Sequence, residues 1–316
     1  MAQSVTEAAA QHRRGGPLQS PSMRLSLRPP PLPGQTWADW RAQAPRLVLG
    51  ALLLTAGLSL SGSVLDRAWC LALQQSLGGW PTTWSLLTWS ALGICSLLLV
   101  TCLSDGEPRR VASLLVAMVL GGLVVHAIKR SLQVDRPLAV FGPDHPVFHV
   151  IGEHLRKGSM PSGHTTTAFT VAGLMTLSVR DAVRLGGMLP TQLQRFVSAA
   201  VWTGWWLLAG LQGLSRVVVG AHWPSDVVAG AGLGLILAPL VWQLGVTQRL
   251  AQGLSRASVR PWVGGAVPVL AVLLCLLDLG TPLPAAWCAA VGGLGLLGAW
   301  RWGRILPAAH AANPLS

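Results

Sequence analysis

The fold is decided by residues 84–128, which read WSLLTWSALGICSLLLVTCLSDGEPRRVASLLVAMVLGGLVVHAI. Two apolar runs are separated by the short stretch SDGEPRR, which holds all the charged residues. Each run is close to the roughly 20 residues that a helix needs to cross a bilayer. Lys and Arg concentrate in cytoplasmic loops, so Arg109 and Arg110 indicate that this turn lies on the cytoplasmic side of the membrane. The stretch therefore predicts a hairpin of two transmembrane helices.

The same pattern recurs along the chain. The 316 residues are 51% hydrophobic and 11% charged, whereas soluble domains are about one quarter charged. The pattern predicts an all-α, polytopic integral membrane bundle with a six-helix core and two additional C-terminal transmembrane helices. Windows of about 19 residues place the spans at 46–65, 84–103, 110–128, 165–180, 197–218, 226–245, 263–279 and 284–303.

Membrane topology explains the formal net charge of +12 better than nucleic acid binding does. The basic residues form short clusters between apolar runs and do not form one stripe. With a cytoplasmic N-terminus, most clusters lie on the inner side of a cell-membrane protein, and both termini are cytoplasmic. The connection 129–164, the longest between spans, then lies outside. Loops of that length tend to carry function.

Three regions follow from this organisation. Residues 1–44 are rich in Pro, Ser, Gln and Arg, which predicts a disordered cytoplasmic tail. Residues 45–248 form the predicted core, and residues 249–316 hold the additional helix pair. The five cysteines lie mostly in apolar runs and lack paired metal spacing. We infer neither a disulfide framework nor a zinc site.

Three polar segments lie at the predicted outer face. The first is KRSLQVDRP, residues 129–137, and the second is PSGH, residues 161–164. The third is SRVVVGAHWPSD, residues 215–226. Because successive helices alternate in direction, the outer ends of spans three and five and the outer starts of spans four and six should meet. The sequence therefore predicts one site built from all three segments.

These segments resemble the signature of the type 2 phosphatidic acid phosphatase superfamily (PAP2), within its bacterial membrane lipid phosphatase branch. That signature is Lys, six residues, Arg-Pro; then Pro-Ser-Gly-His; then Ser-Arg, five residues, His, three residues, Asp. Every fixed position is matched here. An ordered set of this kind is far more specific than a single short motif. The resemblance spans about 45–248 and implies a phosphatase that needs no metal or other cofactor.

Five residues are candidates for binding the substrate phosphate. A transferring phosphoryl group spreads charge over three oxygens, so it needs several fixed cations and backbone donors. Lys129, Arg136 and Arg216 supply the charge. Ser162 is a natural helix N-cap, and Gly163 lets the backbone approach a ligand closely. Each of these features also has a simpler interpretation, as an interfacial anchor or a plain helix cap.

Three residues are candidates for the chemistry. His222 and Asp226 are four residues apart, so the carboxylate can fix one ring nitrogen and leave the other to attack phosphorus. This pairing predicts a phosphohistidine intermediate. His164 would protonate the leaving oxygen and then activate water. The resemblance implies the same roles.

Other polar residues carry weaker signals. Metal binding is disfavoured for a histidine-rich part of the outer loop, because it lacks helical ligand spacing; this part contains Asp144, His145, His149, Glu153 and His154. His126 is predicted to make a buried hydrogen bond. Arg156 and Lys157 could receive a second phosphate or remain solvated loop charges.

These observations favour a membrane lipid phosphatase with an extracytoplasmic site. Its substrate should be amphipathic. Undecaprenyl diphosphate, phosphatidylglycerophosphate, phosphatidic acid and lipid A all fit this description, and we rank the polyprenyl diphosphate first among them. Its expected partners are this substrate and the surrounding membrane lipids. A lipid phosphotransferase of the same superfamily is a second hypothesis, and a transporter is a third. A vanadate-dependent haloperoxidase and a basic anion-binding module fit less well.

Overall fold

The computed structural model describes residues 37–104, 107–177, 191–277 and 284–304, and all regular secondary structure in these ranges is helical. The described residues belong to the compact unit Gln35–Ser316, whereas the unit Met1–Gly34 lies outside them, as does most of the predicted tail. The first helix begins at Trp37, so residues 37–44, predicted as disordered tail, are helical. The predicted all-α fold is confirmed.

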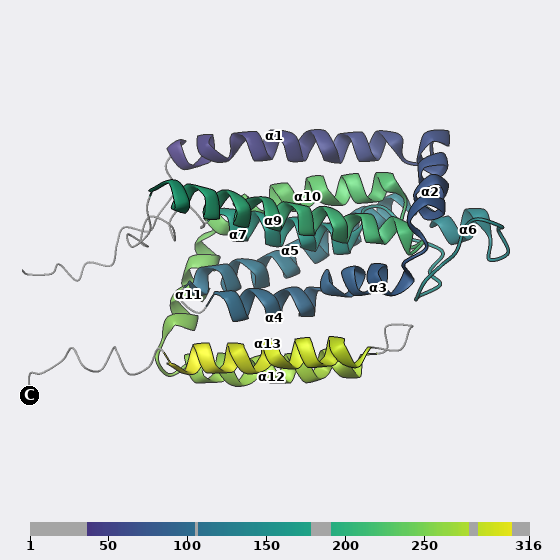
Figure 1. Ribbon diagram of the computed structural model, residues 1–316. Helices are drawn as coiled ribbons and strands as arrows, with labels where there is room; N and C mark the ends of the chain where they lie inside the picture. Colours follow the sequence, from purple (N-terminus) through teal and green to yellow (C-terminus); the bar gives the residue numbers. More distant parts are fainter. Residues whose placement is uncertain (1–36, 105–106, 178–190, 278–283, 305–316) are drawn as a thin grey trace, which may run out of the picture. The chain divides into compact units, whose positions relative to one another are not determined.

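The helices are labelled in Figure 1. They are α1 (Trp37–Leu60), α2 (Val64–Leu77), α3 (Pro81–Ser90), α4 (Gly93–Leu103), α5 (Pro108–Leu132), α6 (Pro137–Phe141), α7 (Gly163–Leu177), α9 (Thr191–Val218), α10 (Pro224–Gln243), α11 (Gly245–Ser255), α12 (Arg260–Leu276) and α13 (Ala285–Arg304). Each predicted span has a helical counterpart, although residues 178–180 of the fourth span and residues 278–279 of the seventh lie outside the described ranges.

Fewer helices than the eight predicted are long and apolar enough to cross a membrane alone. Among the described residues, the three that qualify are α1, α5 together with α6, and α10. The number rises to five if each of two bent pairs, α3–α4 and α11–α12, counts as one span. Helices α9 and α13 contain several Trp and Gly residues, which lower their mean hydropathy. The described part of α7 is only 15 residues long.

The predicted span 84–103 is two helices bent by 68°. Leu92 separates them because its ψ of 141° is extended and ends the helical path. Hydropathy is continuous across this point, so the sequence windows could not reveal the break. The bend places residues 91–93 beside the functional site described below.

Glycines let helix α10 pack closely between α1 and α7. A Cβ on Gly232 would lie 2.5 Å from the Gly50 carbonyl oxygen of α1. On the side facing α7, a Cβ on Gly230 would lie 2.6 Å from the Ser162 carbonyl oxygen. Such small-residue contacts are typical of helix packing in membranes. They fix the start of α10, which carries Asp226, against the start of α7.

The C-terminal helices α12 and α13 pack on each other and on α4. The cluster that joins them consists of Cys95, Leu98, Cys102, Val267, Ala271, Leu274 and Val291. Cys102 also donates to the Leu294 carbonyl at 2.8 Å. All five cysteines are free thiols. The pair therefore supports α4 from the side.

Candidate active site

The three polar segments meet at one end of the helices, the end at which α2 and α6 also lie (Figure 1). Lys129 is in the last turn of α5, Arg136 precedes α6, and Arg216 is in the last turn of α9. The second and third segments are joined directly, because the Ser162 amide donates to the Asp226 carbonyl at 3.0 Å. The predicted convergence of the segments is thus observed in the structure.

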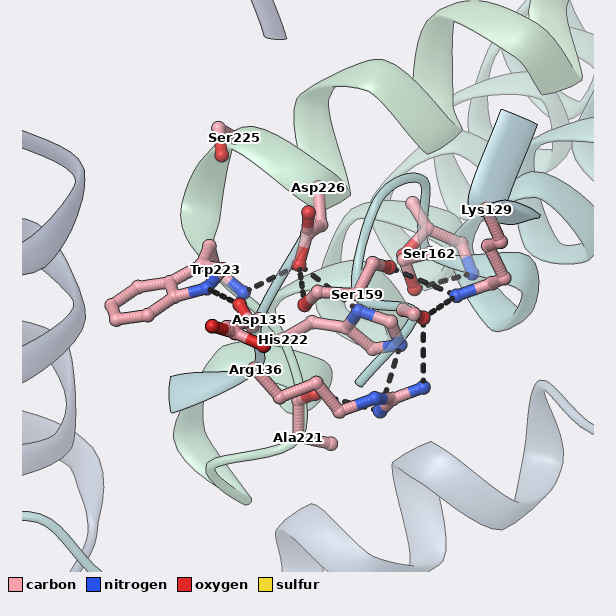
Figure 2. Close-up of polar contacts among 12 residues, drawn as sticks. Lys129, Asp135, Arg136, Ser159, Ser162, Ala221, His222, Trp223, Ser225 and Asp226 are labelled. Carbon is pink, nitrogen blue, oxygen red and sulfur yellow. Dashed lines mark hydrogen bonds and ion pairs between the residues drawn. The ribbon is translucent and has the colours of Figure 1, made fainter. Parts of the chain in front are cut away.

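His222 and Asp226 form a buried pair. His222 Nδ1 lies 3.1 Å from Asp226 Oδ2, and the two side chains are 3% and 0% exposed. The same carboxylate oxygen accepts from the Trp223 amide at 2.9 Å and from the Ser159 hydroxyl. Three donors therefore converge on Oδ2, as Figure 2 shows. A carboxylate at Nδ1 selects the tautomer that carries its proton there and leaves Nε2 with a free lone pair.

The free nitrogen of His222 faces positive charge. Nε2 lies 3.5 Å from Arg136 Nη1, so the ring is between Asp226 and Arg136 (Figure 2). Burial, and then the charges of Arg136, Arg216 and Lys129, hold the pKa of His222 well below its ordinary 6.5. The imidazole is therefore neutral at neutral pH, as a nitrogen nucleophile must be.

Arg136 and Lys129 are held by backbone carbonyls of the outer loop and of the loop before α10. Arg136 donates to the Lys157 carbonyl at 3.1 Å and to the Ala221 carbonyl at 2.8 Å. Lys129 donates to the carbonyls of Gly158 and Ser159, the latter at 2.9 Å. These bonds orient both cations without neutralising their charge.

Arg216 is buried with one unsatisfied donor. Its side chain is 8% exposed, and its Nε has no hydrogen-bond partner within the described residues. Within the same ranges, none of the three cations makes a salt bridge. Uncompensated buried charge is costly unless a counter-ion completes it. The site is therefore prepared for an anion.

Two cavities lie beside these residues. The polar cavity, about 90 Å³, is lined by Arg136, Arg216, His164 and Glu153, together with residues of α3 and of the loop before α10. The apolar cavity, about 260 Å³, lies between the α3–α4 bend, α5, α7 and Leu237 of α10. His164 and Leu92 line both cavities. A molecule with a charged head and an apolar body could occupy the two together.

The apolar cavity remains apolar although three threonines of α7 line it. The hydroxyls of Thr166, Thr167 and Thr170 donate to carbonyls one turn earlier, at 3.0, 3.1 and 2.7 Å. Each hydroxyl is thus satisfied within the helix, which leaves the methyl groups as the natural lining. Gly121 and Gly122 of α5 form part of the opposite wall.

Comparison with known proteins agrees with this geometry. A sequence model described as the PAP2 superfamily matches residues 110–250, the range that holds all three polar segments. This part of the chain belongs to the PAP2 superfamily. The match begins within α5 and ends within α11, so it leaves out α1 to α4 and the C-terminal helix pair of the chain.

Two relatives of this chain carry the names of lipid-phosphate phosphatases. The chain is 31% identical over 131 residues to the Lipid A 1-phosphatase of Rhizobium etli, covering 39% of this chain and 45% of that protein. It is 31% identical over 138 residues to the Decaprenylphosphoryl-5-phosphoribose phosphatase of Mycobacterium tuberculosis, and this match covers 44% of this chain and 64% of that protein. The chain thus spans less than two thirds of either relative. A structural match to the crystal structure of Aquifex aeolicus LpxE covers 63% of this chain and 94% of the LpxE chain, at 20% sequence identity and a TM-score of 0.27.

The remaining predicted site residues lie at the start of α7. Ser162 caps the helix, because its hydroxyl accepts from the Thr165 amide at 3.4 Å and from the Thr165 hydroxyl at 3.0 Å. A Cβ on Gly163 would meet only Val125, at 3.9 Å. The first amides of a helix lack partners within it. In α7 the Thr165 and Thr166 amides are already bonded to Ser162, so the amides of Gly163 and His164 are the ones that lack a partner within the described residues.

Several weaker predictions have clear outcomes. His126 is exposed on α5, so the predicted buried hydrogen bond is wrong; that face of α5 lies outside the helix bundle. Arg156 and Lys157 are exposed and line neither cavity. They contribute backbone carbonyls to Arg136 instead. His145 Nδ1 accepts from the Phe148 amide at 3.0 Å. The described residues contain no group of three side chains that could hold a metal.

Sequence reasoning missed two residues of the site. Ser159 donates to the catalytic candidate Asp226, and Glu153 lines the polar cavity beside the two arginines. Ser159 lies three residues before Ser162, but no spacing rule connects it to a carboxylate 67 positions away. Both contacts arise only when the outer loop folds back over the helix ends.

Proposed function

We propose that this PAP2 protein is a membrane lipid phosphatase that hydrolyses a phosphomonoester or pyrophosphate bond through a phosphohistidine. The observation that carries the proposal is the buried, Asp226-bound His222 among three cations that lack salt bridges within the described residues. A neutral imidazole nucleophile and uncompensated positive charge are what phosphoryl transfer to histidine requires.

In the proposed first step, the Nε2 lone pair of His222 attacks phosphorus. An N–P bond forms while the P–O bond to the lipid breaks, and a protonated His164 gives its proton to the departing oxygen. Burial and the nearby cations lower the pKa of His164 in the free protein, so the bound phosphate must supply the negative charge that lets His164 hold this proton. Asp226 stabilises the positive charge that develops on the His222 ring, because it accepts the Nδ1 proton at 3.1 Å. Arg136, Arg216 and the first amides of α7 stabilise the phosphoryl oxygens.

In the second step, water replaces the histidine. His164, now neutral, takes a proton from water, and the water oxygen attacks phosphorus. The N–P bond breaks, its electron pair returns to Nε2, and inorganic phosphate leaves. His164 suits both steps because it lines the polar cavity and the apolar cavity. No residue in this sequence of steps needs a metal.

The adjoining cavities support an amphipathic substrate. The phosphate would occupy the polar cavity, and the hydrocarbon nearest to it would occupy the apolar one. Each buried methylene contributes about 0.8 kcal/mol. Undecaprenyl diphosphate, phosphatidylglycerophosphate, phosphatidic acid and lipid A share this chemistry, and the named relatives act on lipid A and on a polyprenyl-linked phosphate. We place a polyprenyl diphosphate first.

The charge pattern supports an extracytoplasmic site. Arg109 and Arg110 lie at the start of α5, at the opposite end from Lys129. If the positive-inside rule orients this helix, the site faces outward and both termini are cytoplasmic in the inner membrane. A substrate on the outer leaflet would then reach the site without crossing the bilayer.

The test is phosphate release from a panel of lipid phosphates by the purified full chain in detergent with a chelator. We expect release by the wild type, loss of at least a thousandfold in His222→Ala, and wild-type rates in the matched control His126→Ala, which changes an exposed histidine. Release that vanishes in chelator, or that survives in His222→Ala, would contradict the proposal. Loss of substrate phosphate without release would indicate phosphotransfer.

A further inference from the structure

Helix α2 lies outside the PAP2 match, and none of its residues lines either cavity. Its buried residues nevertheless form a single stripe, Asp66, Cys70 and Gln74, with one residue per helical turn. Two of the three are polar, which is unusual for the buried face of a 14-residue helix. All three contact the chain between Arg216 and Asp226, which we name the catalytic segment.

Gln74 binds the first part of the catalytic segment. Its Nε2 lies 3.4 Å from the Val217 carbonyl and 3.2 Å from the Val218 carbonyl. The same amide group pairs with His149 of the outer loop, donating to its carbonyl and accepting from its N–H, both at 2.9 Å. A single side chain thus joins α2, the end of α9 and the outer loop.

Gly220 shows how closely the catalytic segment approaches this contact. Its φ is +74°, a left-handed conformation that favours glycine. A Cβ there would lie 2.5 Å from the His149 carbonyl and 3.0 Å from Gln74 Nε2. The turn that leads to His222 is therefore packed directly against the Gln74 amide.

Asp66 binds the other end of the catalytic segment. Its Oδ1 accepts from the Ser225 amide at 2.9 Å, and its Oδ2 accepts from the Ser225 hydroxyl at 2.6 Å. Asp66 is 2% exposed, and Ser225 is 1% exposed. Ser63 in turn caps α2 by accepting from the Asp66 amide at 3.1 Å. Both carboxylate oxygens are therefore committed to the residue next to Asp226.

Cys70, midway between the two polar contacts, supplies an apolar one. It belongs to the same buried cluster as Val217 and Trp223, which lie on either side of the Gly220 turn. Trp223 also donates from its ring nitrogen to the Asp135 carbonyl at 2.7 Å. Gln74 and Asp66 thus bind the start and the end of the catalytic segment, and Cys70 shares a buried cluster with residues on both sides of its turn.

We propose that α2 is a brace that fixes the catalytic segment, with Asp66 and Gln74 as positioning residues for the His222–Asp226 pair. This inference rests on the proposed function. Neither residue touches a cavity, so each acts through the backbone. Losing either contact would leave buried polar groups unpaired and would loosen the turn that aims His222. The PAP2 site therefore depends on a helix that the family match does not include.

The test compares kinetics and amide hydrogen exchange in the purified full chain. Gln74→Leu removes the brace, and Gln75→Leu makes the same change at the adjacent exposed position. We expect Gln74→Leu and Asp66→Ala to lower kcat at least tenfold with KM within twofold, and to speed exchange in residues 216–226 but not in α5. We expect Gln75→Leu to match the wild type. Asp66→Asn should recover part of kcat, because an amide can still pair with Ser225.

The brace is wrong if Gln74→Leu and Asp66→Ala keep kcat within twofold of Gln75→Leu, or if kcat falls without faster exchange in residues 216–226. If Gln74→Leu fails to fold, a double-mutant cycle with Ser225→Ala decides instead. The single variant Ser225→Ala should lower kcat, but it should not lower kcat further when combined with Asp66→Ala. Additive losses of kcat would overturn the proposal. A wild type without phosphatase activity would refute the proposed function, while the exchange data would still test the brace.

Discussion

The two cavities that meet at His164 are built in opposite ways. The polar cavity is lined by helix ends and by the outer loop, where Arg136, Arg216 and Glu153 lie. The apolar cavity is lined by α5, by α7 and by the α3–α4 bend, and its walls combine glycines and threonines with Leu, Met and Val side chains. Backbone carbonyls orient the charges of the polar cavity, whereas apolar side chains and small residues enclose the other cavity. Under the proposed function, the chemistry would take place in the polar cavity and the lipid tail would bind in the apolar one.

The largest expected effect comes from removing a charge from the polar cavity. Arg216→Met should lower kcat/KM by about a hundredfold to a thousandfold, as for other preorganised donors to a transition state. Because Arg216 is buried without a salt bridge within the described residues, the same change should not lower the midpoint of thermal unfolding.

The control for this prediction is Arg130→Met, which removes an exposed cation from the same end of α5. It should leave both kcat/KM and the unfolding midpoint at wild-type values. Equal losses in Arg216→Met and Arg130→Met would mean that general surface charge matters and the polar cavity does not.

Filling the apolar cavity should have a smaller and more selective effect. Gly122 lines this cavity, is exposed, and has no atom within 4 Å of a built Cβ, so Gly122→Leu fits without strain on α5. We expect kcat/KM for a long-chain lipid phosphate to fall about tenfold, the loss of roughly two buried methylenes. Hydrolysis of a short-chain, soluble analogue should stay within twofold.

Gly204→Leu is the matched control for the apolar cavity. Gly204 is also an exposed helical glycine with open space at its Cβ, but it lies on α9 and does not line the cavity. It should leave both substrates unaffected. If Gly122→Leu changes long-chain and short-chain substrates equally, the apolar cavity does not receive the tail.

The smallest expected effect concerns pH. Burial and neighbouring cations hold the pKa of His222 well below 6.5, so the free enzyme keeps a neutral nucleophile as pH falls through 6.5. Protonation removes the attacking lone pair, so kcat/KM should fall only below that lowered pKa. The acid limb of kcat/KM, corrected for titration of the substrate phosphate, measures it. An acid limb that reports a pKa at or above 6.5 would contradict the burial of His222 among cations.

Much of the candidate site was predictable because its residues follow a local spacing. His222 and Asp226 are four positions apart, and that spacing placed the carboxylate at one ring nitrogen. Apolar runs of about 20 residues predicted an all-helical membrane protein. The same windows averaged over the α3–α4 bend, because hydropathy does not record the direction of the backbone. They also assigned no helix to α2, whose 14 residues are too short and too polar for a span.

The sequence by itself determined the class of fold, the candidate residues for phosphoryl transfer and the expectation that they would converge. Only the tertiary structure decided which groups hold them in place, since Asp66 and Ser225 are 159 positions apart and nothing in either neighbourhood specifies the partner. The physical reason is that apolar periodicity and motif spacing are properties of adjacent residues. Buried hydrogen bonds between distant segments form only once packing has excluded water and left each polar group a single partner.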